Sequence, residues 1–243
     1  MANNRQTIAK NIATMLNDGD VVNLGIGIPT MVSNYVPEGM TILLHGENGC
    51  IGQDKSLQTP WPEEYATREE FIEVWKTKDG DWKTGHRDLY NASNELITLI
   101  PGACCFDTVT SFGIARGGHL NATILGGLQV DQEGNLASWS IPGVRTNGMG
   151  GSMDLVSGAK KVIVAMEHTS KDGSPKFLKK CTFPLTAVNC VSVLVTERCI
   201  VEFRDGKPVV TAMAPGETKE SLQAATGAEL AFADEIKVMA VVE

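Results

Sequence analysis

Long apolar runs are missing from this sequence. No window approaches the roughly 18 consecutive apolar residues of a membrane-spanning helix. The first residues, MANNRQTIAKNIATML, also lack an uninterrupted apolar core of signal-peptide length. We therefore expect a cytoplasmic protein that does not associate with a membrane.

An excess of positive charge is missing as well. The chain has 21 Lys and Arg residues against 29 Asp and Glu residues, a formal net charge of −8. A surface of that sign repels phosphate backbones and anionic lipids, so nucleic acid and membranes are excluded as main partners. Apolar residues make up 42% of the chain and charged residues 21%, which is ordinary for a globular fold with a real core.

Metal-ligand spacing is the third absence. The six cysteines form neither a C-x-x-C pair nor a Cys/His pattern typical of a zinc site. We therefore expect no bound metal, and thiols that are reduced and mostly structural. The cysteines stand at positions 50, 104, 105, 181, 190 and 199.

Helical and strand-like segments alternate along the chain. Helices are expected at 6–17, 30–36, 111–118 and 217–227. Strands are expected at 21–27, 41–45, 95–102, 122–130, 160–167 and 189–197. Two of these contain unbroken apolar runs, ITLI (97–100) and VIVAM (162–166), which suits a sheet covered on both faces. The pattern predicts an α/β fold with a mostly parallel sheet and flanking helices.

We interpret residues 1–243 as a single domain. Residues 53–92 stand apart because they are rich in Trp, Glu, Lys and Asp and carry three of the four tryptophans. We expect this stretch to be a surface insertion that modulates substrate choice or subunit assembly.

The stretch LLHGENGCIG (43–52) holds one acid, Glu47, between Gly46 and Asn48-Gly49. Turn chemistry explains the glycines, and an ordinary strand-to-loop turn would leave Glu47 in solvent. That interpretation gives no reason for a glutamate at the apex. Similar glycine-dense loops recur beside other predicted strands, where backbone amides can approach a ligand closely.

A dinucleotide fingerprint is a second interpretation. Gly25 and Gly27 follow a predicted strand, and Glu47 comes 20 residues after Gly27, where an acid would hold ribose hydroxyls. However, Thr30 occupies the place of the third glycine. Pro29 also removes an amide where that motif needs one. The match is therefore weak.

Several spaced motifs together carry a third interpretation. GENGCIG (46–52), RGGHLNATILGGLQV (116–130), GNLASWSIPG (134–143) and NGMGGSMDLV (147–156) occur in this order. The chain thereby resembles the B-type subunit of the family I (3-oxoacid type) coenzyme A transferases, over roughly 6–52 and 95–240. The resemblance implies a NagB/RpiA/CoA-transferase-like fold. It also implies transfer of CoA between a short-chain acyl-CoA and a free carboxylic acid through a glutamyl-CoA thioester.

The resemblance also implies roles for single residues. Glu47 matches the family's covalent nucleophile, and Asn48 would orient Glu47 or cap the following turn. Gly46 stands where the motif most often has serine, so the contribution of that hydroxyl is absent or replaced. The amide of Gly126 would stabilise the oxyanion. The expected substrate-binding and CoA-binding residues are Asn48, Gly25, Gly27, Gly127, Gly150 and Gly151.

A separate A-type subunit is the implied partner, in a hetero-oligomer. Coenzyme A would be substrate and covalent intermediate, with no permanently bound cofactor. Acetate, acetoacetate and butyrate all stay open as acyl groups, which points to short-chain fatty acid or ketone-body metabolism. The alternatives are a sugar-phosphate isomerase or deaminase of the same fold, and a non-catalytic ligand-sensing module.

Overall fold

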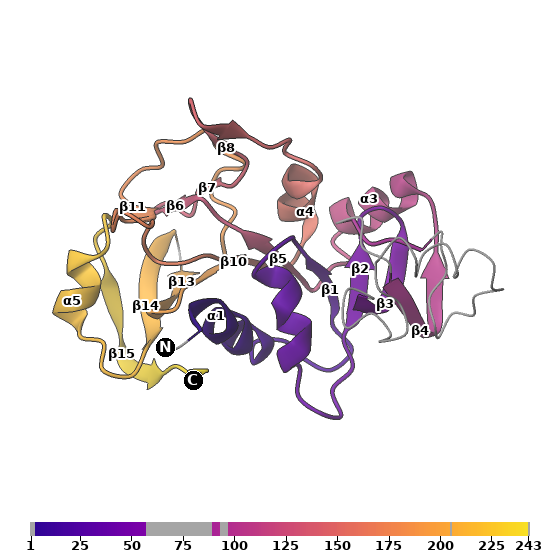
Figure 1. Cartoon of the computed structure of the whole chain (residues 1–243), viewed down its shortest axis with the longest axis horizontal. Helices are drawn as coiled ribbons and strands as arrows, with labels where there is room; N and C mark the ends of the chain where they lie inside the picture. The colour runs from indigo at the N-terminus through magenta and orange to yellow at the C-terminus, as the bar shows by residue number, and fades with distance from the viewer. Residues whose placement is uncertain (1–2, 57–88, 93–96, 205, 243) are drawn as a thin grey trace, which may run out of the picture. The chain divides into compact units, whose positions relative to one another are not determined.

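A computed structural model describes residues 3–56, 89–92, 97–204 and 206–242 (Figure 1). The chain divides into two compact units. Unit 1 comprises Met1–Ile42 and Ala115–Glu243, and unit 2 comprises Leu43–Ile114. Of the expected surface insertion, residues 53–56 belong to a strand, and 57–88 lie outside the described residues.

Unit 1 is built on a twisted sheet in the order β15-β14-β13-β12-β10-β5-β1. Its strands are β1 (Val21–Leu24), β5 (Ala122–Gly126), β10 (Val162–Ala165), β12 (Val193–Val195), β13 (Cys199–Arg204), β14 (Lys207–Met213) and β15 (Ala231–Val238). Strands β1, β5, β10 and β12 run parallel to one another, β13 is antiparallel to β12 and β14, and β15 is parallel to β14. The expected α/β class with a mostly parallel sheet is confirmed.

Four helical segments accompany this sheet. They are α1 (Asn4–Ala13), the 3-10 helix η1 (Pro29–Tyr35), α4 (Ser152–Gly158) and α5 (Lys219–Ala224). Helix α1 contacts η1, β10 and β12, and buries Ile8 and Ile12 completely. The side chain of Asn3 caps α1 by accepting a hydrogen bond from the Gln6 amide. The Asn3 amide donates to the Val242 carbonyl, so the two ends of the described chain lie side by side (Figure 1).

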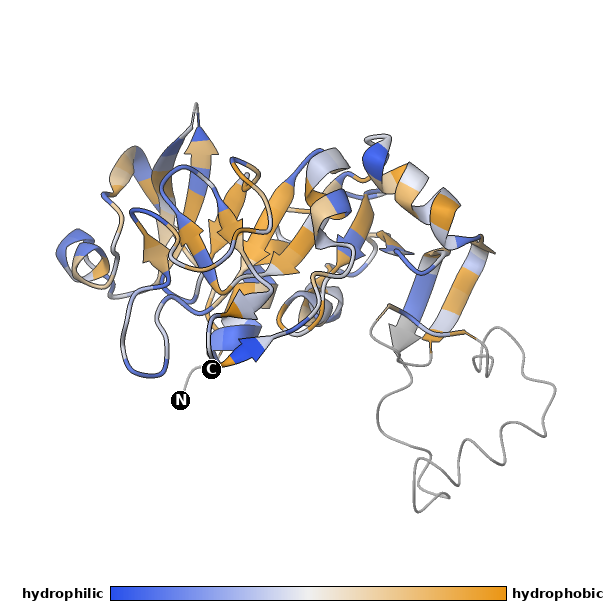
Figure 2. Ribbon diagram, turned by 90° about the horizontal axis from the view of Figure 1, so that it is seen from above, coloured by the Kyte–Doolittle hydropathy of each residue, from blue (hydrophilic) through white to orange (hydrophobic). Residues whose placement is uncertain are grey.

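The core of unit 1 is centred on its parallel strands. Figure 2 shows hydrophobic residues along these strands and more hydrophilic residues on the surrounding helices and loops. All four residues of β10, VIVA, are buried, as expected for a strand covered on both faces. Two small sheets complete the unit. One holds β6 (Gln129–Asp131), β7 (Leu136–Ala137) and β11 (Phe177–Leu178), and the other holds β8 (Ser140–Ile141) and β9 (Arg145–Thr146).

Unit 2 contains an antiparallel arrangement of β2 (Leu43–Gly46), β3 (Cys50–Ser56) and β4 (Ile97–Cys105). Helix α3 (Thr108–Arg116) follows β4 and runs into unit 1 at its last residues. The hairpin from β2 to β3 carries Glu47 at its turn. This places the acid directly at the carboxyl end of β2.

All four expected helices have other bounds or another type, and the one expected at 111–118 spans Thr108–Arg116. The helix expected at 6–17 ends at Ala13, and the segment at 30–36 is a 3-10 helix. The late helix at 217–227 ends before Ala225, so no glycine caps it.

Two of the strand predictions are wrong in detail. The segment 122–130 is two strands in two sheets, because the chain leaves the main sheet between β5 and β6 at Gly127-Leu128. The ITLI run belongs to β4, which pairs antiparallel with β3 and loses burial after Thr98. It is therefore not a strand covered on both faces. Strands β3, β13, β14 and β15 were not expected from the sequence, since their apolar residues are interrupted by polar ones.

No helix in the described part of the chain is long and apolar enough to cross a membrane. The six cysteines all fall within the described ranges and are free thiols, with Cys104 and Cys105 exposed.

Candidate active site

Glu47 occupies a tight turn between two paired strands. Gly46 and Cys50 are register partners in the hairpin of β2 and β3. The Gly49 amide donates to the Gly46 carbonyl across 2.9 Å, which closes a β-turn with Glu47 and Asn48 at its two central positions. Glu47 is half-buried and Asn48 is exposed. The turn therefore presents one acid at its apex, as the sequence indicated.

Gly49 is the one position of this turn that only glycine can fill. Its φ is +127°, and a Cβ atom there would overlap the carbonyl oxygen of Phe106. The Phe106 amide in turn donates to the Gly49 carbonyl across 3.0 Å. Backbone contact with the residue after β4 thus fixes the far end of the turn.

Asn48 ties the turn to a third segment. Its side-chain amide nitrogen donates to the Tyr90 carbonyl across 2.6 Å. The roles expected for Asn48 stay predictions. The side chain occupies the space over Gly46, because a Cβ atom at position 46 would lie 2.8 Å from the Asn48 Oδ1 and 3.2 Å from the Cys50 Sγ. Glycine in place of the usual serine therefore leaves room for the amide of Asn48.

Two buried polar side chains lie beneath the turn, and sequence analysis missed both. His45 on β2 is 2% exposed and Ser111 on α3 is fully buried. The Ser111 Oγ lies 2.9 Å from the His45 Nε2, and it donates to the Gly46 carbonyl across 3.0 Å. A lone histidine inside an apolar strand run was the available signal for His45. Ser111 gave no signal, because serine is common on helices.

Cys50 does not compete with Glu47 as a nucleophile. Its side chain is buried, and burial raises the pKa of the thiol to about 11. At neutral pH the group is therefore protonated and inert. This agrees with the interpretation of Cys50 as a packing residue.

The glycines expected to bind substrate belong to unit 1, whereas Glu47 and Asn48 belong to unit 2. Within unit 1, the loop after β1 and the turn after β5 lie side by side. The Gly25 amide donates to the Ile124 carbonyl across 2.8 Å, and a Cβ atom at Gly126 would lie 3.8 Å from the Ile26 carbonyl oxygen. Both loops follow the carboxyl ends of parallel strands, where α/β sheets bind ligands.

The remaining glycines differ in what surrounds them. Gly27 and Gly150 have positive φ values, +91° and +55°, with open space around a would-be Cβ atom. A Cβ atom at Gly127 would lie 2.7 Å from the Val164 Cγ1, so packing alone explains that glycine. Gly151 is the N-cap of α4, and its carbonyl accepts from the Leu155 amide.

Among the residues that the structure describes, no group of three or more His, Cys, Asp or Glu side chains could hold a metal ion. What the turn offers chemically is one carboxylate on a rigid support. Such a group can act as a covalent nucleophile or as a base.

Comparison with known proteins decides between the CoA-transferase, dinucleotide-binding and isomerase interpretations. The family model described as "Coenzyme A transferase" matches residues 5–61 and 83–224. The chain belongs to the coenzyme A transferase family. The dinucleotide-binding and isomerase interpretations are thereby set aside, and the expectation of a CoA-transferase is confirmed.

Relatives within the coenzyme A transferase family resemble the chain to different extents. It is 46% identical to the acetate CoA-transferase subunit beta of Escherichia coli K12, over 96% of this chain and 95% of that protein. It is 39% identical to the mitochondrial succinyl-CoA:3-ketoacid coenzyme A transferase 2B of Mus musculus, over 97% of this chain but 41% of that protein.

One solved structure of similar fold is the acyl-CoA transferase YdiF of Escherichia coli O157:H7 in a thioester complex with CoA. It has a TM-score of 0.70 at 18% identity, over 99% of this chain and 44% of that chain. The match confirms the expected fold, and this chain spans less than half of YdiF.

Proposed function

We propose that the chain is the B-type, nucleophile-bearing subunit of an acyl-CoA:carboxylate CoA-transferase, and that Glu47 is the nucleophile. The supporting observation is the position of this single acid in a hydrogen-bonded turn, closed by Gly46 and Gly49. A rigid turn suits a carboxylate that must attack along a fixed line, since positioning contributes up to about 7–11 kcal/mol to such reactions.

The proposed chemistry balances without a metal or a redox group. The Glu47 carboxylate attacks the thioester carbonyl, which forms a mixed anhydride and releases the CoA thiolate. The thiolate then attacks the Glu47 side-chain carbonyl, which forms a glutamyl-CoA thioester and releases the donor acid. The acceptor acid repeats both steps in reverse. Thioester energy is conserved because no water takes part.

A thioester between CoA and the side chain is supported by the similar fold of YdiF, which was solved as a thioester complex with CoA. The assignment of Gly126 to the oxyanion stays a prediction. Its position at the end of β5, with no side chain to block its amide, is compatible with that role. The CoA-channel role of Gly150 and Gly151 also stays a prediction.

A separate A-type subunit is the proposed partner. The bacterial relative is called a beta subunit and has nearly the length of this chain, whereas the mitochondrial enzyme is more than twice as long. A second chain would supply what the longer enzyme holds in one polypeptide. The names of these relatives suggest short acids such as acetate or 3-oxoacids as acyl groups, and the acyl specificity itself is part of the proposal.

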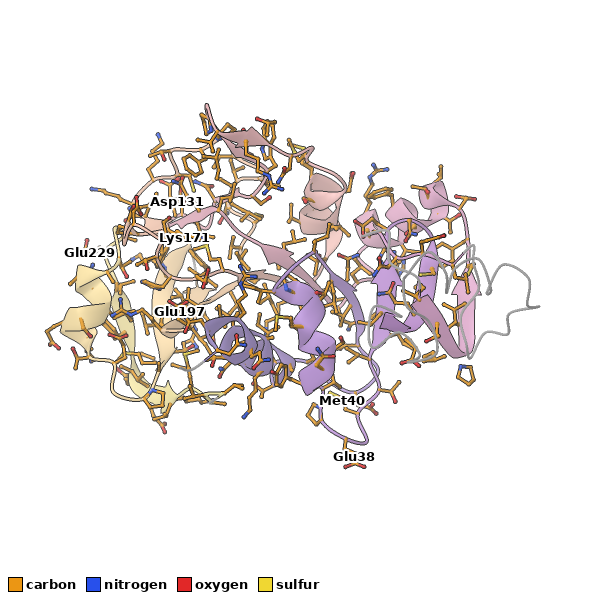
Figure 3. The ribbon with its side chains drawn as sticks, viewed as in Figure 1. Glu38, Met40, Asp131, Lys171, Glu197 and Glu229 are labelled. Atoms are coloured by element: carbon orange, nitrogen blue, oxygen red, sulfur yellow. The ribbon has the colours of Figure 1, made fainter. Side chains whose placement is uncertain are left out.

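Replacement of the nucleophile tests this function. Glu47→Gln keeps the shape of the side chain but cannot form the anhydride, so kcat for CoA exchange in the complex should fall by more than about 100-fold. Glu38→Gln is the matched control, because Glu38 is an exposed acid on the loop after η1, with its side chain directed outward (Figure 3). Retention of more than about a hundredth of the original kcat in Glu47→Gln would refute the assignment.

A further inference from the structure

A chain of hydrogen bonds holds the turn that carries Glu47. It runs from the His45 Nε2 to the Ser111 Oγ, from there to the Gly46 carbonyl, and it meets the Gly49 amide at the same carbonyl. The distances are 2.9, 3.0 and 2.9 Å. Both side chains are buried, at 2% and 0% exposure, so water does not compete for these bonds.

The direction of each bond follows from what each group can donate. A carbonyl only accepts, so the single hydroxyl hydrogen of Ser111 points to Gly46. Toward His45 the hydroxyl must therefore accept, and the His45 Nε2 carries a hydrogen. Burial lowers the pKa of His45, although the neighbouring Glu47 charge opposes this effect. The network thus assigns a hydrogen to the His45 Nε2, and burial favours the neutral form of the ring.

The carbonyl held in this way belongs to the peptide that leads directly into Glu47. Gly46 has no Cβ atom, and glycine samples more backbone conformations than any other residue. Its own chemistry therefore does nothing to fix the peptide plane before the nucleophile. The hydroxyl of Ser111, presented by α3, supplies that restraint from outside the hairpin.

We propose that Ser111 and His45 are positioning residues for Glu47. Ser111 fixes the plane of the peptide between Gly46 and Glu47, and His45 fixes the hydroxyl of Ser111. This inference rests on the proposed function, because it needs Glu47 to be the nucleophile. A displacement of the reacting carboxylate by about 1 Å can cost about 100-fold in rate, so loss of the restraint should act on kcat.

Ser111→Ala is the primary test, measured in the complex with the A-type subunit. We expect kcat for CoA exchange to fall by about 10- to 100-fold while KM changes by less than about threefold. Ser157→Ala is the matched control, because Ser157 on α4 makes a similar bond to a helix carbonyl but lies exposed. Its kcat should stay within about twofold of the original.

Two amide variants of His45 test the geometry without removing polarity. The side-chain amide nitrogen of Gln reaches the position of an imidazole Nε2, whereas that of Asn reaches only the position of Nδ1. His45→Gln should keep kcat within about threefold, and His45→Asn should lower it at least about tenfold. Equal kcat values for His45→Gln and His45→Asn would overturn the inference. This test does not depend on whether Ser111→Ala can be purified.

Single-turnover formation of the Glu47–CoA thioester separates this inference from the proposed function. The original complex should form the thioester rapidly, and Ser111→Ala should form it more slowly but to the same final extent. If the original complex exchanges no CoA and forms no thioester, the proposed function fails. If it forms the thioester and Ser111→Ala forms it at the same rate, only the positioning role is wrong.

Discussion

Gly49 shows how far the shape of the turn that carries Glu47 depends on a missing side chain. Its φ of +127° and its contact with the Phe106 carbonyl oxygen both exclude a Cβ atom. Gly102 in β4 has a similarly positive φ of +90° but open space around it. Substitution of Gly102 would therefore cause backbone strain alone, whereas substitution of Gly49 would cause both backbone strain and steric overlap.

Gly49→Ala should accordingly destabilise the protein more than Gly102→Ala. Adoption of the positive φ by alanine costs about 1–3 kcal/mol at either site, and overlap with Phe106 adds to this only at position 49. Urea unfolding of both variants measures the difference, which we expect to exceed about 1 kcal/mol. Equal losses would show that the turn moves away from Phe106 without cost.

At the residue scale, the sequence predicted Glu47 as a functional acid but did not predict the buried residues His45 and Ser111 that contact its turn. Glu47 could be found because its neighbours Gly46, Asn48 and Gly49 form a local pattern in the chain. The contact between His45 and Ser111 joins residues 66 positions apart, and neither is unusual in its own segment. Only the fold, which lays α3 against the end of β2, brings them together.

At the scale of elements, unbroken apolar runs predicted strands well and interrupted runs did not. The run VIVA became β10, between β12 and β5 in the unit 1 sheet, whereas β13 and β14, whose apolar residues are interrupted by polar ones, were missed. The sequence also did not show where one strand ends and the next sheet begins. The glycine pair at 126–127 was read as part of one strand, although β5 ends at Gly126 and the chain continues into a second sheet at β6.

The buried His168 links the segments that follow β10, β12 and α5. His168, just after β10, bonds through its ring to the hydroxyls of Thr196, after β12, and Thr226, after α5. Its amide donates to the carboxylate of Glu197, the residue after Thr196. Burial, reinforced by the charge of Arg198, lowers the pKa of His168 to about 4.

Stability should therefore fall in mild acid. The folded pKa of about 4 lies below the unfolded value of 6.5, so the unfolded chain binds the proton more tightly. The loss begins as the pH falls below about 6.5 and is complete near 4, and it should reach about 2 kcal/mol between pH 7.5 and 5. Urea unfolding at both pH values measures it. His168→Gln should remove this part of the pH dependence, and an unchanged slope in that variant would contradict the account.

At the scale of the whole molecule, dependence on a partner is the main expectation. The chain matches 41% of the mouse mitochondrial enzyme and nearly all of a bacterial beta subunit. The purified chain alone should show little CoA exchange, and addition of an A-type subunit should restore it. A kcat near 10 s⁻¹ for the single chain, typical of a complete enzyme, would show that no second subunit is needed.

The central claim is that Glu47 carries CoA as a thioester. The complex should be incubated with a donor acyl-CoA and no acceptor acid, and then treated with borohydride. A thioester carbonyl is reduced whereas a free carboxylate is not, so only the donor-treated enzyme should lose activity. Peptide mapping should then find a primary alcohol at position 47, a loss of about 14 Da from glutamic acid, as covalent carboxylate catalysis requires. An active complex in which borohydride never marks Glu47 would contradict the account.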